Sequence, residues 1–175
     1  ASEFDPVTCQ SMLLDHGLAV PFELCWPDAS EWPVKVVPIS INTVQHPLPS
    51  PKRCFELGKA VGNAIACWPG NEKIVVLGTG GLSHQLDGER AGHINVDYDK
   101  FCLRNIASDP EALLQHDTLD IVELAGSQGV EILNWLAARG ALRGAVRELA
   151  SNYHVPISNT AAATVLMENR ETVLA

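Results

Sequence analysis

The stretch IVVLGTGGLSHQ, residues 74–85, decides the predicted fold. Its first four residues, Ile74 to Leu77, form a short apolar block flanked by turn residues, which is typical of a buried central strand in an α/β sheet. The glycine-rich part follows at once, in the place where open α/β sheets carry ligand-binding loops. We therefore predict a strand at 74–77 that leads into a functional loop.

Elements on both sides of this stretch complete an α/β pattern. Upstream, β-branched residues predict a strand over 33–42, and Ser50 followed by Pro51 predicts the start of a helix. Strand, helix and strand in this order indicate a βαβ crossover, and hence a mixed or parallel sheet flanked by helices on both faces. Downstream we predict helices near Ser108 and Ser127, a helical stretch over 142–152, a short strand over 153–157 and a last helix after Asn159.

Bulk composition restricts the classes of protein to which the chain can belong. With 175 residues, 46% of them apolar, it can bury one substantial core, so we predict a single domain over 1–175. Twelve Lys and Arg against 21 Asp and Glu, a net charge of −9, provide no basic stripe for a nucleic acid. No stretch approaches the roughly 20 apolar residues of a membrane span. Five cysteines without a CxxC pair predict reduced thiols in a cytoplasmic protein.

The loop itself is the first candidate site. Glycines allow a ligand to approach the backbone closely, and the imidazole of His84 can be directed into a cleft. The loop is no dinucleotide fingerprint, because Ser83 stands where a third glycine is required, and it has no Gly-Lys-Ser/Thr ending. From the residues alone, His84 is either a site residue or a loop imidazole that hydrogen-bonds backbone carbonyls. A metal-independent hydrolase that uses Ser83 has little support, because the Gly-x-Ser-x-Gly elbow is missing.

Residues 78–86, continued by 88–95, resemble the catalytic histidine loop of class III extradiol ring-cleavage dioxygenases. The resemblance is to the catalytic (beta) subunit of the protocatechuate 4,5-dioxygenase and gallate dioxygenase type, in its carboxy-terminal part. It covers nearly the whole chain in the family's order. The matching segments are LDHG at 14–17, EWPVKV at 31–36, AGSQGVE at 125–131, YHVP at 153–156 and SNTA at 158–161.

The resemblance implies a role for each of five residues. Enzymes of this type hold Fe(II) with two histidines and one glutamate, and Glu131 matches the glutamate. His84 matches the acid/base residue, and His16 matches a second active-site histidine. Ser158 and Asn159 match the end of the pocket that contacts the substrate. Without the family, Glu131 would be a solvated acid at a helix start, His16 a support of a tight turn, and Ser158-Asn159 a helix cap.

The resemblance also implies that parts are missing. The family's two iron-binding histidines lie in an amino-terminal segment, and nothing here matches either of them. We therefore expect a sheet that is incomplete at the N-terminus, poor Fe(II) binding, and inactivity without the missing N-terminal part or a complementary chain. Exposed apolar surface and an unpaired strand edge would then favour an oligomer. The resemblance further implies a small alpha-type subunit as a partner.

The function implied is Fe(II)-dependent extradiol (meta) cleavage of a carboxylated catechol, such as protocatechuate or gallate, using O2. The alternative is a degenerate, non-catalytic dioxygenase-like subunit that binds aromatic acids but no metal. Iron content and oxygen uptake discriminate between the two interpretations.

Overall fold

The computed structural model describes residues 4–170, and the chain divides into two compact units, Ala1–Ile41 and Asn42–Ala175. Among its described residues, 4–41, the first unit contains one helix, α1 (His16–Cys25). The Asp15 side chain caps it by accepting a hydrogen bond from the Leu18 backbone N–H at 3.1 Å. The Phe22 ring stacks on the Trp32 ring with 4.7 Å between centroids, which packs the unit locally.

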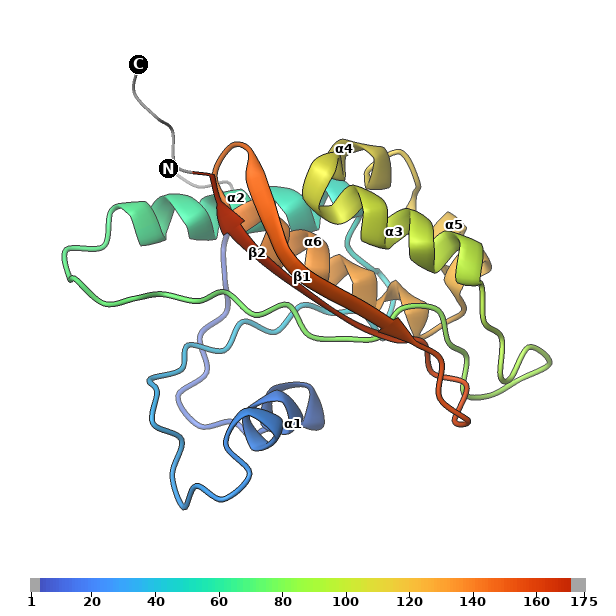
Figure 1. The fold of residues 1–175 in the computed structure, drawn as a ribbon, viewed down its shortest axis with the longest axis horizontal. Helices are drawn as coiled ribbons and strands as arrows, with labels where there is room; N and C mark the ends of the chain where they lie inside the picture. Colours follow the sequence, from blue (N-terminus) through green and yellow to red (C-terminus); the bar gives the residue numbers. More distant parts are fainter. Residues whose placement is uncertain (1–3, 171–175) are drawn as a thin grey trace. The chain divides into compact units, whose positions relative to one another are not determined.

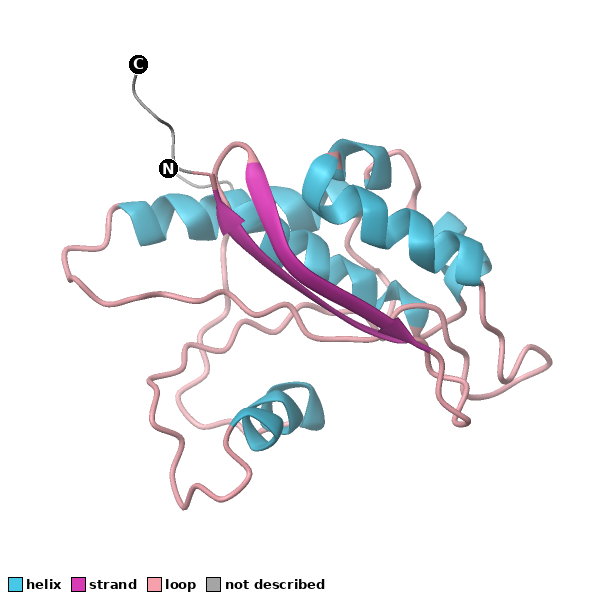
Figure 2. Cartoon of the chain, in the orientation of Figure 1, coloured by secondary structure: helices cyan, strands magenta, loops and turns pink. Residues whose placement is uncertain are grey.

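The second unit contains the remaining helices and both strands of the described chain (Figures 1 and 2). The α/β class is confirmed, although the described sheet has only two strands, β1 and β2, which pair antiparallel. None of the helices among residues 4–170 is both long and apolar enough to cross a bilayer. The elements are α2 (Pro51–Ala66), α3 (Val96–Ser108), α4 (Pro110–Leu113), α5 (Thr118–Ala125), the 3-10 turn η1 (Gly129–Glu131), α6 (Ile132–Ala141), β1 (Val146–His154) and β2 (Ala162–Asn169).

Helix α2 begins where the sequence predicted. The Ser50 hydroxyl accepts a hydrogen bond from the Arg53 backbone N–H at 3.2 Å, and Pro51 occupies the first turn. This helix packs against α6 through glycines: a Cβ at Gly58 would overlap the Ala137 carbonyl, and one at Gly62 would overlap the Ala141 carbonyl. The two helices therefore touch backbone to backbone, and this contact fixes the orientation of α6.

The core of the second unit joins α3, α5 and α6 to the glycine-rich loop. Leu82 in the loop is 2% exposed, as buried as the apolar side chains of the helices. Burial of this side chain removes its apolar surface from water and so holds the loop on the helices. The most deeply buried helical and turn side chains include Cys54, Cys102, Ile106, Ile121, Val130, Ile132, Leu133 and Leu136.

The two predicted apolar strands do not form. Residues 33–42 and 74–77 belong to neither a helix nor a strand, and Val37 and Val75 are 86% and 74% exposed. Strands depend on hydrogen bonds and side-chain contacts with a neighbouring strand, and no described segment pairs with either stretch. The predicted βαβ crossover is consequently absent from residues 4–170.

Two carboxy-terminal segments form strands where helices were predicted. Residues 142–152 were predicted helical, but β1 begins at Val146, after a turn in which Gly144 has a φ of +65°. The predicted last helix is β2, and only the first two residues of the predicted strand 153–157 belong to β1. Glu, Leu and Ala in these segments favour helices, but cross-strand pairing overrides such weak preferences.

Two predicted helix caps were misplaced. Ser108 is the last residue of α3, and its hydroxyl donates to the Arg104 carbonyl at 2.6 Å instead of capping a new helix. Ser127 donates to the Gln128 side chain at 2.7 Å, and α6 begins only at Ile132, after η1. The helix predicted near Ser127 thus exists, but it starts one turn later.

Candidate functional site

Side chains at the start of α6 hold the glycine-rich loop by its backbone. Residues 131, 134 and 135 have the spacing that places side chains on one face of a helix. One of these groups accepts a hydrogen bond and two donate, so consecutive loop residues are fixed. The contacts join Glu131 Oε2 to the Gly81 N–H at 2.7 Å, Asn134 Nδ2–H to the Thr79 carbonyl at 3.0 Å, and Trp135 Nε1–H to the Gly80 carbonyl at 3.0 Å.

His84 is buried, with 6% of its surface exposed, and its ring has a defined orientation. Nδ1 lies 2.9 Å from the Leu82 carbonyl oxygen, which can only accept, so Nδ1 carries the proton. The backbone N–H of His84 donates to the Ala125 carbonyl at 2.8 Å. In the neutral imidazole, Nε2 then presents its lone pair, and no described residue hydrogen-bonds it. This is the arrangement required of a general base.

Glu131 and His84 meet at the dipeptide Gly80-Gly81. A Cβ on Gly80 would lie 2.6 Å from Glu131 Cβ, and one on Gly81 would lie 2.9 Å from His84 Cε1. Gly80 also has a φ of +129°, which disfavours any residue with a side chain. The two glycines therefore leave room for the two side chains, and the structure brings together Glu131 and His84 although they are far apart in sequence.

Ser158 and Asn159 immediately precede a residue that pairs with the histidine. Thr160 forms an isolated antiparallel bridge with His84, and the next residue, Ala161, donates its N–H to the Ser83 carbonyl at 3.1 Å. Ser158 and Asn159 are exposed, and neither caps a helix. Asn159 instead adopts a φ of +52°. Asn159 is thus one residue, and Ser158 two residues, before the residue that pairs with His84, and a substrate contact for either remains a prediction.

His16 belongs to the first unit, where it is the exposed first residue of α1. The alternative to a catalytic role was that His16 supports a tight turn with Asp15 and Gly17. The structure has a capped helix start there instead. A catalytic role for His16 remains a prediction.

A buried carboxylate, Asp99, escaped the sequence analysis. It is 1% exposed and accepts three hydrogen bonds: from the Ser83 N–H at 2.8 Å, the Ser83 hydroxyl at 2.6 Å and the Tyr153 hydroxyl at 2.8 Å. Burial, and secondarily the Asp99 carboxylate, raises the pKa of Tyr153, which keeps this hydroxyl a donor. A signal was present, because Asp99 shares the apolar face of α3 with Cys102 and Ile106.

This network gives Ser83 a structural role. Its hydroxyl donates to Asp99 and accepts from the Asn95 backbone N–H at 2.8 Å, and the residue is fully buried. Both hydrogen-bonding directions are used by neighbours, so no free hydroxyl remains for nucleophilic attack. The geometry therefore gives no support to the hydrolase alternative.

Replacing Asp99 with alanine is expected to lower the free energy of unfolding by about 3 kcal/mol or more, because it leaves several buried donors without a charged acceptor. The control is Tyr153→Phe, which removes only one of these donors and should cost about 1–2 kcal/mol. Urea denaturation of the chain and both variants provides the measurement. Equal losses in the two variants would show that Asp99 does not organise the loop.

The described residues do not supply a complete metal site. Among residues 4–170, no group of three or more His, Cys, Asp or Glu side chains is placed to hold a metal ion. Glu131 contributes one carboxylate, whose Oε2 is oriented by the Gly81 N–H. An oriented carboxylate suits one position of a facial triad, but the two histidines of such a site are not provided here.

Comparison with known proteins agrees with the resemblance seen in the sequence. The model of a family described as the catalytic LigB subunit of aromatic ring-opening dioxygenase matches residues 1–165. The chain belongs to this family. Its relationship to the extradiol ring-cleavage dioxygenases is thereby confirmed.

Individual relatives are also named as dioxygenases. A gallate dioxygenase from Pseudomonas putida is 37% identical over 174 residues, which are 99% of this chain and 51% of that protein. A 2,3-dihydroxyphenylpropionate/2,3-dihydroxicinnamic acid 1,2-dioxygenase from Photorhabdus laumondii is 38% identical over 89 residues, which are 51% of this chain and 27% of that protein. The chain therefore spans about half the length of the gallate dioxygenase, and less of the second relative.

Proposed function

We propose that this chain forms part of the active site of an Fe(II)-dependent extradiol dioxygenase that cleaves a carboxylated catechol, such as gallate or protocatechuate, with O2. The observation that carries the proposal is the meeting of Glu131 and His84 at Gly80-Gly81. The names of the relatives support ring opening as the reaction class. The match to a gallate dioxygenase over almost the whole chain supports gallate as the first substrate to test.

In this proposal Glu131 is the carboxylate ligand of the iron. Its Oε2 already accepts the Gly81 N–H, so Oε1 is the oxygen available for a metal. A ferrous ion bound by two histidines and one carboxylate keeps open positions for substrate and dioxygen. Residues 4–170 provide no set of three ligands for a metal ion. We therefore propose that a complementary chain or segment supplies the two histidine ligands.

His84 acts in this proposal as the acid/base group. The proton on Nδ1 is engaged by the Leu82 carbonyl, so Nε2 would take a proton from a catechol hydroxyl and later return it. Ser158 and Asn159 would hold the ring carboxylate through hydroxyl, amide and backbone donors. His16 would be a second histidine that contacts the substrate.

The partner would pair with residues 74–77. The side chains of Ile74 and Leu77 are 43% and 57% exposed, and this backbone has no strand partner among the described residues. A strand from a complementary chain would pair with this apolar stretch and cover it directly before the site loop. We also propose an oligomer, a small alpha-type subunit as a further partner, and a cytoplasmic location in which the five free thiols persist.

Reconstitution tests the proposed function. The chain is combined with an amino-terminal dioxygenase segment that carries two iron-binding histidines, and Fe(II) is added under nitrogen. Oxygen uptake and the yellow ring-fission product are then followed with gallate and with protocatechuate. We expect turnover of at least one substrate by the complex and none by either part alone. A correctly assembled, iron-loaded complex that opens neither ring would contradict the proposal.

A second candidate function rests on the incomplete ligand set. A dioxygenase-like subunit that binds aromatic acids without a metal would also keep the organised loop. Calorimetry with gallate on the assembled complex distinguishes the two functions. Binding without iron in the purified complex, and without oxygen uptake, would favour the non-catalytic subunit.

A further inference from the structure

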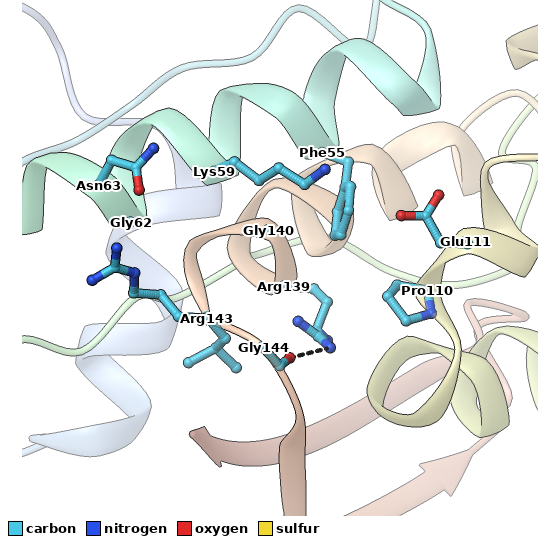
Figure 3. Close-up of a pocket in the computed structure, with 11 residues that line it drawn as sticks. Phe55, Lys59, Gly62, Asn63, Pro110, Glu111, Arg139, Gly140, Arg143 and Gly144 are labelled. Atoms are coloured by element: carbon cyan, nitrogen blue, oxygen red, sulfur yellow. Dashed lines mark hydrogen bonds between the residues drawn. The ribbon is translucent and has the colours of Figure 1, made fainter. Parts of the chain in front are cut away.

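A pocket of about 410 Å³ lies away from the glycine-rich loop, within the second unit (Figure 3). Its walls come from α2, the start of α4, the end of α6 and the turn that leads to β1. Neither Glu131 nor His84 lines it, and Arg139 stands eight residues after Glu131, about 12 Å along the helix. The volume is in the range of small-molecule sites, which begin at about 300 Å³.

Arg139 is buried in this pocket without a full set of partners. Only 6% of its surface is exposed, yet among residues 4–170 its guanidinium makes one hydrogen bond, from Nη2 to the Gly144 carbonyl at 3.5 Å. Its Nε–H has no acceptor among the described residues. A buried cation without a counter-charge is costly, and burial accordingly lowers the pKa of Arg139.

The packing of α6 prevents Arg139 from avoiding this position. The next residue, Gly140, contacts α2 so closely that a Cβ there would overlap the Phe55 carbonyl. The helix therefore cannot rotate to carry Arg139 into solvent without breaking the contact with α2. Figure 3 shows the guanidinium between Gly144 and Pro110, at the lower side of the pocket.

The other lining residues are suited to an organic anion. Lys59 and Arg143 add two cations, whereas Glu111 is the one acid that lines the pocket. Lys59 is held by Glu56 at 2.8 Å and lies 4.8 Å from the centre of the Phe55 ring. No acid forms an ion pair with Arg139 in the part of the chain that the structure describes. The apolar walls are Phe55, Pro110 and Leu142.

We propose that this pocket binds a small organic carboxylate, with the carboxylate on the Arg139 guanidinium and the apolar body against Phe55, Pro110 and Leu142. The planar guanidinium offers the donor fork that fits a carboxylate. A bound carboxylate would give the Nε–H the acceptor it lacks. This inference is independent of the proposed function, because it requires neither iron nor a complementary chain.

Titration of the full chain with benzoate tests the proposal. Benzoate carries one carboxylate on an apolar ring and has no hydroxyl groups to be deprotonated. Calorimetry on the iron-free chain should show binding that weakens at least tenfold in Arg139→Met. The matched control, Arg104→Met, removes an exposed cation from α3 outside the pocket and should leave the affinity unchanged.

Stability measurements separate loss of the ligand site from loss of the fold. Met fills much of the space of Arg without a charge, so the midpoint of thermal unfolding of Arg139→Met without ligand should equal or exceed that of the original chain. If this variant does not fold, Arg143→Met serves instead and should weaken benzoate binding. Absence of benzoate binding, an unchanged affinity in the pocket variants, or binding of inorganic phosphate but not benzoate would each overturn the proposal.

Discussion

Replacing Glu131 with glutamine is expected to remove iron from the reconstituted complex and to reduce turnover by more than about 100-fold. Changes in groups that merely orient a metal ligand cost about 10–100-fold in metal affinity or activity, so loss of the ligand charge should cost more. Glutamine keeps an oxygen that can accept the Gly81 N–H, which leaves the loop anchored. The measurements are iron content after desalting and oxygen uptake with gallate.

Glu123→Gln is the matched control for this change. Glu123 is exposed in α5, and its contact with Arg90 is made by the backbone carbonyl, which accepts at 2.7 Å and is unchanged by the substitution. This variant should keep full iron content and turnover. If Glu131→Gln retains iron as well as Glu123→Gln does, then Glu131 is not a ligand, and its role would be limited to anchoring the loop through the Gly81 N–H.

Replacing His84 with glutamine is expected to reduce turnover by about 100-fold to 10,000-fold while leaving the iron in place. The amide can still donate to the Leu82 carbonyl, as Nδ1 does now, but unlike the imidazole it offers no nitrogen lone pair that can take up and return a proton. The measurement is the rate of the yellow product at saturating substrate. Partial rescue by added imidazole would identify the missing function as proton transfer.

His154→Gln provides the control, because His154 is exposed at the end of β1 and has no assigned role. It should leave the rate unchanged. Equal rates for His84→Gln and the original chain would assign His84 to a structural role in the loop. Loss of iron together with loss of rate would instead indicate that the substitution disturbs the metal site.

Local signals predicted the fold where they were strong. The cap at Ser50 with Pro51 marked the start of α2 because both residues act within one helical turn. Local signals could not decide whether residues 74–77 form a strand, because a strand forms only when another strand pairs with it. The same limit explains the carboxy-terminal hairpin, in which the pairing of Val146 with Asn169 and of His154 with Ala162 overrides helix-forming composition.

The candidate site, like the fold, was predicted only in part from the sequence. Glu131 and His84 were identified because each lies in a motif that the resemblance assigns, although sequence spacing could not show that both reach Gly80-Gly81. Asp99 was missed because its one sequence signal, its place on the apolar face of α3 with Cys102 and Ile106, shows burial but not the hydrogen-bond partners that make a buried carboxylate stable. Its partners Ser83 and Tyr153 come from segments that only the fold brings together.

Glu131 and His84 lie against two adjacent glycines, and this arrangement limits the substitutions that can be made at the site. Any side chain introduced at Gly80 presses on the carboxylate, and any introduced at Gly81 presses on the imidazole. Because the two glycines are one peptide bond apart, a shift that relieves one clash moves the other group as well. Substitutions at these positions should therefore be strongly non-additive, and retuning one group would require compensating changes in α6 rather than in the loop.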